Sequence, residues 1–67
     1  MGLAKLREEQ GLTQQDLADE VAISQPLVSM IGTGQVRPWA NLRKRIAQAL
    51  GASASEIWPE LEDFNGA

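Results

Sequence analysis

The 67-residue sequence contains no cysteine and no histidine. This excludes disulfides, thiolate chemistry, histidine-ligated zinc and any Ser-His-Asp or Cys-His catalytic arrangement. Long apolar runs are also missing: none approaches the roughly 20 residues of a membrane-spanning helix, and the N-terminus lacks the charged and then apolar segments of a signal peptide. These absences favour a small cytoplasmic protein without a membrane partner, metal or cofactor.

Carboxylates are missing from the middle of the chain. The net charge is −3, yet residues 21–55 include no aspartate or glutamate, while Arg37, Arg43, Lys44 and Arg45 all lie there. Residues 1–55 hold all 6 bases, so the acidic excess comes from the last part of the chain. This distribution predicts a body with a basic surface and an acidic tail, although an ordinary solvated surface with uneven charge fits it as well.

The only secondary-structure signals in the sequence are helical. A helix-forming stretch, residues 2–10, is followed by Gly11, and glycine suits the left-handed position that ends a helix. Thr13 then predicts an N-cap, with Asp16 in the first turn of a second helix. Residues 22–24 are too few for anything but a tight turn. The second helix is expected to bury Leu17, Ala18 and Val21.

Further cap and breaker residues mark a third and a fourth helix. Ser24 is a helix-capping residue type, and Pro26 is tolerated because it lies in the first turn of the third helix. Val28 and Ile31 face inward, residues 32–34 stop the helix, and residues 35–38 form a loop. A fourth helix is expected over residues 39–50. Its buried face should hold Trp39, Leu42, Ile46, Ala49 and Leu50.

A fifth helix follows Gly51. Ser53 and Glu56 have the spacing of a capping box, and Pro59 disfavours continuation of the helix beyond Trp58. Trp39 and Trp58 are both expected in the core. The sequence therefore predicts an all-α domain of five helices over residues 1–58 and an acidic tail, residues 59–67. The tail's Leu61 and Phe64 either form a dimer contact or belong to a disordered segment.

Residues 14–33 have the spacing of a helix-turn-helix. Ala18, at the fifth position of the segment, is small because the second helix of the motif packs against it. Apolar residues at the fourth, eighth, tenth, fifteenth and eighteenth positions bury the inner faces, which leaves the outer face of the second helix free to enter a DNA major groove. These residues are Leu17, Val21, Ile23, Val28 and Ile31.

The motif and its flanks resemble the phage lambda repressor and Cro-like family, also called the XRE family. The resemblance rests on LTQQDLA (12–18), SQPLVSMI (24–31), the pair Arg37-Pro38 and IAQALG (46–51). It covers roughly residues 3–58. It implies a five-helix, repressor-like domain of bacterial or phage origin that binds operator DNA, commonly as a dimer.

Two residues depart from the family pattern. Ala22 stands where the family usually has a glycine in the left-handed conformation, at a cost of roughly 1 kcal/mol for alanine. Gly32 stands where the family has a glutamate that pairs with an arginine of the first helix. Arg7 occupies that arginine's position without its partner, so we expect it on a DNA phosphate or on a carboxylate of the acidic tail.

The resemblance places the base-reading residues on the outer face of the third helix. There, Gln25 can bond adenine N6 and N7, and Ser29, one turn later, can reach either kind of base. The apolar residues of this face suit thymine methyl groups, although they could instead bind protein, or Leu27 could pack in the core. The expected set is Ser24, Gln25, Pro26, Leu27, Ser29 and Met30.

Contacts to the DNA backbone are expected at two places. The N-terminus of the second helix has free N–H groups and a dipole that favour a phosphate, although ordinary capping explains Thr13 equally well. The family's backbone contacts also cluster in the loop after the third helix, where Arg37 could instead reach a minor groove. Arg43 and Lys44 are expected on a solvated face that adds to the positive field. The expected contacts are Thr13, Gln14, Thr33, Gln35, Arg37 and Arg7.

Together these residues predict a regulator that binds double-stranded operator DNA as a homodimer and represses or activates transcription. An antitoxin or restriction-controller protein would use the same face. The alternative is a protein-interaction module on the same scaffold, favoured by the acidic pI and by a third helix without Arg or Lys, and the C-terminal tail could bind a protein partner. The carboxylates Glu60, Glu62 and Asp63 have no base, nucleophile or metal ligand near them, so an enzyme is not expected.

Overall fold

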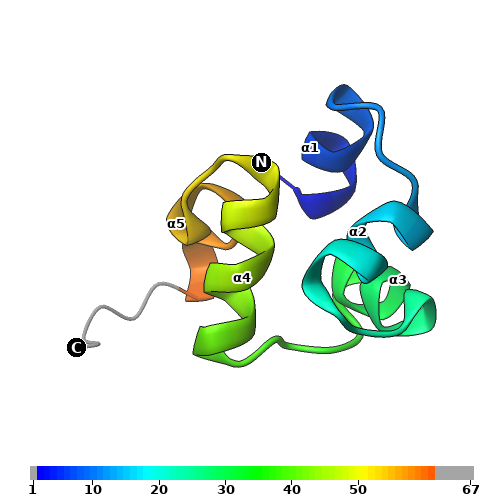
Figure 1. Cartoon of the computed structure of the whole chain (residues 1–67). Helices are drawn as coiled ribbons and strands as arrows, with labels where there is room; N and C mark the ends of the chain where they lie inside the picture. Colours follow the sequence, from blue (N-terminus) through cyan, green and yellow to red (C-terminus); the bar gives the residue numbers. More distant parts are fainter. Residues whose placement is uncertain (1, 62–67) are drawn as a thin grey trace.

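The computed structural model describes residues 2–61, which form helices and no strand (Figure 1). This confirms the all-α fold class expected from the sequence. The helices are bounded as α1 (Leu3–Glu9), α2 (Gln14–Val21), α3 (Gln25–Thr33), α4 (Ala40–Leu50), α5 (Ala54–Ile57) and a short 3-10 helix, η1 (Pro59–Leu61).

The helices pack around one core, with α4 between two groups of helices. Figure 1 shows α5 on one side of α4 and the α2–α3 pair on the other, and α1 contacts α3. Helix α4 contacts α2 and α5, and α3 contacts α2 and α1. Val28 and Ile31 of α3 face the core, and the outer side of α3 remains exposed. The buried apolar residues are Leu3, Leu17, Ala18, Val21, Val28, Ile31, Leu42, Ile46, Ala47, Leu50, Ile57 and Trp58.

Side chains that bond distant backbone carbonyls tie the helices together. Gln10 Nε2 donates to the carbonyl of Leu50 at 2.5 Å and so joins the end of α1 to the end of α4. The Arg45 guanidinium of α4 donates to the carbonyl of Val21, the last residue of α2. Because the last carbonyls of a helix lack partners within the helix, these two bonds satisfy groups that would otherwise depend on water.

The expectation that Trp39 belongs to the core is wrong. Helix α4 begins at Ala40, and Trp39 is its extended N-cap residue, with its side chain 57 % exposed. The preceding Pro38 is fully buried and occupies the inward position instead. On the buried face of α4, Ala47 is buried while Ala49 is only half-buried. Trp58, in contrast, lies in the core as expected.

Helix α3 is longer than the glycines in its sequence suggested. The segment 32–34 was expected to stop the helix, but Gly32 and Thr33 continue it. The helix ends only at Gly34, whose φ of 86° is left-handed and favours glycine. A glycine with ordinary helical φ weakens a helix without ending it, and this is the case at Gly32.

Ala22, between α2 and α3, is the one described non-glycine residue with positive φ (59°). An alanine in this conformation strains the folded state by roughly 1–2 kcal/mol. A glycine would remove this strain, but its more flexible unfolded chain would offset part of the gain in stability. We therefore expect Ala22→Gly to raise the free energy of unfolding by about 0.5–1 kcal/mol, measured by urea denaturation. Ala49→Gly, inside α4, should lower it by about 0.5–1 kcal/mol. If both variants lose stability, Ala22 is not strained.

Candidate nucleic-acid interface

The turn between α2 and α3 is fixed by caps at both ends. The backbone N–H of Ile23 bonds the Ala18 carbonyl at 3.0 Å, and the Ser24 hydroxyl accepts from the Leu27 N–H at 3.3 Å. Ala18 itself is 0 % exposed, which agrees with its expected place where the two helices meet. Ser24, expected as a base reader, thus uses its hydroxyl oxygen to cap α3, and its side chain remains exposed.

The first residues of α2 and α3 are joined by a side-chain hydrogen bond. Gln25 Nε2 donates to Gln14 Oε1 at 2.8 Å. Gln25 is exposed, and the bond uses one of its two amide N–H groups, so one N–H and the carbonyl oxygen remain for a ligand. The amide N–H groups of Gln14 also remain free of partners within the described residues. The side chain expected to read a base and the one expected to contact a phosphate are therefore joined to each other.

The outer face of α3 carries no charge. Gln25 and Pro26 are exposed, Ser29 is half-buried, and Met30 is 36 % exposed. Leu27 is half-buried and packs against the core. The expected alternative, that Leu27 packs in the core, therefore holds for part of its side chain. What remains outside is a strip with one amide, one hydroxyl and apolar groups, which can bond base edges and pack against methyl groups.

The loop from α3 to α4 is anchored by hydrogen bonds at both ends. The backbone N–H groups of Gln35 and Val36 both donate to the Met30 carbonyl, at 2.9 and 3.2 Å. At the other end Arg43 Nη1 donates to the carbonyl of the buried Pro38 at 2.7 Å. Arg37 lies between these two anchors and is exposed.

Two further loop residues were expected as backbone contacts. The Thr33 hydroxyl donates to the Met30 carbonyl at 3.2 Å, and its side chain is exposed. Gln35 is also exposed. The structure thus brings Thr33, Gln35 and Arg37 together at the end of α3, next to the outer face of that helix.

Within residues 2–61, Arg7 contacts Leu12 and Glu8 and no carboxylate of the tail. Its Nη1 donates to the Leu12 carbonyl at 2.6 Å, and its Nη2 lies 3.7 Å from Glu8 Oε2. The side chain is only 12 % exposed. The part of the acidic tail within residues 2–61 supplies no carboxylate to Arg7. The Arg7 guanidinium instead bonds the turn that follows α1. Little of this side chain is left for a phosphate.

Two arginines have structural roles that sequence reasoning missed. Arg43 was expected on a solvated face but is half-buried and fixes the loop before α4, and Arg45 caps the end of α2. One signal was available for Arg45: α2 has no basic residue in its last turn, where a cation is favourable. No rule of sequence spacing indicates which distant arginine supplies the cation at the end of α2.

The N-terminus of α2 is closed by a reciprocal capping box. The Asp16 N–H donates to Thr13 Oγ1 at 2.9 Å, and the Thr13 N–H donates to Asp16 Oδ2 at 2.9 Å. The expected N-cap is therefore confirmed. The free amides of this helix start are thereby partly satisfied by the protein, so ordinary capping accounts for Thr13, and Gln14 is the residue that faces α3.

This cap makes stability depend on pH. The hydrogen bonds from the backbone and side chain of Thr13 lower the pKa of Asp16 from its ordinary value of 3.8. Its contribution is fully present above the pKa of the unfolded chain and is lost as the pH falls through the lower folded value. Below about pH 4, we expect the urea midpoint to fall more steeply for the wild type than for Asp16→Asn, which accepts the same bond without titrating. Parallel curves would contradict this role.

The remaining described residues offer little other chemistry. Within residues 2–61 there is no group of three or more His, Cys, Asp or Glu side chains that could hold a metal ion. The helices of this part of the chain are also too short and too polar to cross a membrane.

A short, capped pair of helices that leaves the outer face of its second helix uncovered defines the helix-turn-helix class, whose members place that helix in a DNA major groove. The family model of the helix-turn-helix domain matches residues 2–57, and the chain belongs to this family. Among solved structures it is similar to the clp gene regulator ClgR from Corynebacterium glutamicum, with 28% sequence identity and a TM-score of 0.79. The match covers 87% of this chain and 62% of that chain, so this chain spans less than two thirds of its structural relative. A search of the curated proteins found no match.

Proposed function

We propose that the protein is a repressor-like transcriptional regulator that binds double-stranded DNA and reads the major groove with α3. The observation that carries this proposal is the bond between Gln14 and Gln25, which fixes a reading amide at the exposed start of α3. With one amide N–H and its carbonyl oxygen free, Gln25 can donate to adenine N7 and accept from adenine N6. Membership of the helix-turn-helix family supports DNA binding, and the structural relative is itself named as a gene regulator.

The contacts we propose are divided between bases and phosphates. Gln25 and Ser29 bond base edges, and Pro26, Leu27 and Met30 pack against thymine methyl groups. Gln14, Thr33, Gln35 and Arg37 contact the backbone and set the register of α3. Because α3 has no arginine or lysine to read guanine O6 and N7, we expect A·T-rich half-sites. A homodimer would read two of them about 10–10.5 base pairs apart.

Selection of binding sites from random duplex DNA at near-physiological salt tests the proposal. Enrichment of an A·T-rich palindrome is the expected result. The protein-interaction module is the second candidate, because the strip on α3 is uncharged and Met30 is partly exposed. Absence of any enriched sequence would favour that candidate, with the α3 strip then meeting a protein.

Binding should also depend only weakly on salt. Arg37 is the exposed cation that the structure places beside α3, while Arg7 and Arg43 are engaged within the protein. Arg37→Ala should weaken binding to all sequences about equally and reduce the slope of log K against log salt by about 1. Lys5→Ala removes the same charge from α1 and should leave the slope unchanged. If Arg37→Ala affects one base pair selectively, Arg37 lies in a minor groove and does not act as a phosphate contact.

A further inference from the structure

Trp39 is a large apolar side chain that contributes little to the fold. It is 57 % exposed, the largest exposed fraction among the large hydrophobic residues in the described part of the chain. It also occupies the N-cap position of α4, where its side chain forms no capping hydrogen bond, since an indole has no oxygen to accept one. A serine or aspartate would stabilise the start of α4 better. Because Trp39 neither caps nor is buried, and tryptophan is enriched at binding surfaces, its position points to a partner outside the chain.

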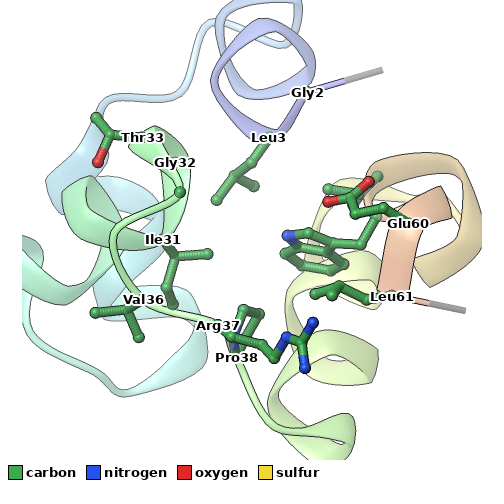
Figure 2. A pocket seen from close by; sticks show the side chains of 13 residues that line it. Gly2, Leu3, Ile31, Gly32, Thr33, Val36, Arg37, Pro38, Glu60 and Leu61 are labelled. Atoms are coloured by element: carbon green, nitrogen blue, oxygen red, sulfur yellow. The ribbon is translucent and has the colours of Figure 1, made fainter. Parts of the chain in front are cut away.

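The loop that follows α3 places Trp39 beside an expected phosphate contact. Figure 2 shows Arg37 and Pro38 next to each other on the segment that leads from α3 into α4. Pro38 is fully buried, whereas Arg37 before it and Trp39 after it are exposed. A residue spans at most about 3.6 Å of extended chain, so the Cα atoms of Arg37 and Trp39 lie within about 7 Å of each other. A DNA strand that contacts Arg37 is therefore within reach of the indole.

Hydrogen bonds on both sides of this segment fix where Trp39 lies. Two backbone N–H groups of the loop donate to the carbonyl of Met30, a residue on the outer face of α3. The Arg43 guanidinium donates to the carbonyl of Pro38, directly before Trp39. The backbone at position 39 is thus anchored with respect to both α3 and α4, so little conformational entropy is lost when a partner binds.

The residues around Trp39 favour an anionic partner. Residues 21–55 contain no aspartate or glutamate, and Arg37 adds a positive charge two residues away. The DNA backbone alternates anionic phosphates with deoxyribose rings, which offer hydrogen-bond acceptors and apolar carbon atoms. An indole matches both, because its face packs against apolar groups and its Nε1–H only donates. The backbone of bound DNA is therefore the partner that the charge and chemistry of this segment favour.

We propose that Trp39 contacts the sugar–phosphate backbone of the DNA bound by α3. Its indole face packs on a deoxyribose, and its Nε1–H donates to a phosphate adjacent to the one that Arg37 binds. This inference rests on the proposed function. The contact involves neither a base nor a charged side chain, so it strengthens binding to every sequence and does not add to the salt dependence. It supplies affinity in an interface where Arg37 is the exposed cation beside α3.

The test compares Trp39→Ser with the wild type on two labelled duplexes, the operator recovered by selection and an unrelated sequence of the same length. We expect the variant to bind both duplexes about fivefold more weakly, the loss expected from one hydrogen bond and its packing. The slope of log K against log salt should stay unchanged, whereas Arg37→Ala reduces it by about 1. Gln48→Ser changes an exposed position of α4 and should bind as the wild type does.

Two further measurements separate a contact from a change in the fold. The urea midpoint of Trp39→Ser should rise, because serine supplies the missing cap of α4, so weaker DNA binding would not reflect unfolding. Acrylamide quenches exposed indoles, and Trp58, the second tryptophan of the chain, is only 6 % exposed. Bound operator should therefore reduce the quenching of wild-type fluorescence severalfold. It should have no effect in Trp39→Phe, where Trp58 is the remaining tryptophan.

The outcomes distinguish this inference from the proposed function. If the wild type binds the operator and Trp39→Ser binds it equally well, or if acrylamide quenches the complex as it does the free protein, Trp39 does not contact DNA and its indole is open to a protein partner. If the variant loses affinity at one base pair only, Trp39 enters a groove and the backbone assignment is wrong. If the wild type binds neither duplex, the proposed function fails and this contact fails with it.

Discussion

Replacing Gln25 with alanine should weaken binding to the selected operator by about 1–3 kcal/mol and relax the preference at one base pair, leaving non-specific binding unchanged. The reason is that Gln25 is the only side chain on the exposed start of α3 with both a donor and an acceptor for one base. The measurement is a binding series over all four base pairs at each half-site position, for the wild type and the variant.

Gln14→Ala provides the matched comparison. It keeps the reading amide but removes the acceptor that orients it, 2.8 Å away. We expect a smaller loss, about 1 kcal/mol, and the same base pair to be affected. In the double variant the two losses should not add, because both changes disrupt one hydrogen-bonded pair. Were Gln25→Ala to retain the wild-type preference everywhere, Gln25 would not be a reader, and the apolar strip on α3 would be the contact surface for a protein.

Leu17→Ala should have the largest effect on stability. Leu17 is 0 % exposed, at the centre of α2 between α3 and α4. Truncating such a leucine costs about 2–5 kcal/mol through lost burial and the cavity left behind. A domain of this length has a total stability of only about 3–10 kcal/mol, so the variant should melt at least about 10 °C lower and be partly unfolded at 37 °C.

Trp39→Ala is the contrasting control for this prediction. It removes a larger side chain, but one that is 57 % exposed and outside the core. Its effect on the free energy of unfolding should stay within about 0.5 kcal/mol. A loss as large as that of Leu17→Ala would mean that the indole packs against the domain and that Pro38 alone does not fill the inward position.

Local signals in the sequence were sufficient wherever one residue type determines a backbone conformation. Thr13 and Asp16 form the expected cap, and Ala22 adopts the left-handed conformation that a glycine would normally take. The buried stripe of α2 follows directly from its helical period. These features involve residues a few positions apart, so their geometry is decided before the helices pack.

The failures occurred where packing, or a bond from a side chain to a backbone carbonyl or another side chain, decides the outcome. Trp39 and Pro38 are neighbours, and which one turns inward depends on the path of the chain into α4. Arg7, Arg43 and Arg45 all bond backbone carbonyls, and for Arg45 the partner is 24 positions away. The pairing of Gln14 with Gln25 likewise spans the turn between two helices. The expected tail residues Glu62, Asp63 and Phe64 lie outside the described residues, whereas Leu61 packs against the core.

The hydrogen bond between Gln14 and Gln25 limits how such a protein can acquire a new operator. The hydrogen-bond partner of Gln25, the proposed reading side chain, is encoded 11 residues earlier, on a different helix. A change of Gln25 to arginine, the usual reader of guanine, would replace the amide that Gln14 holds with a longer, charged group. Under the proposed function, a library designed to retarget the protein should therefore vary positions 14 and 25 together.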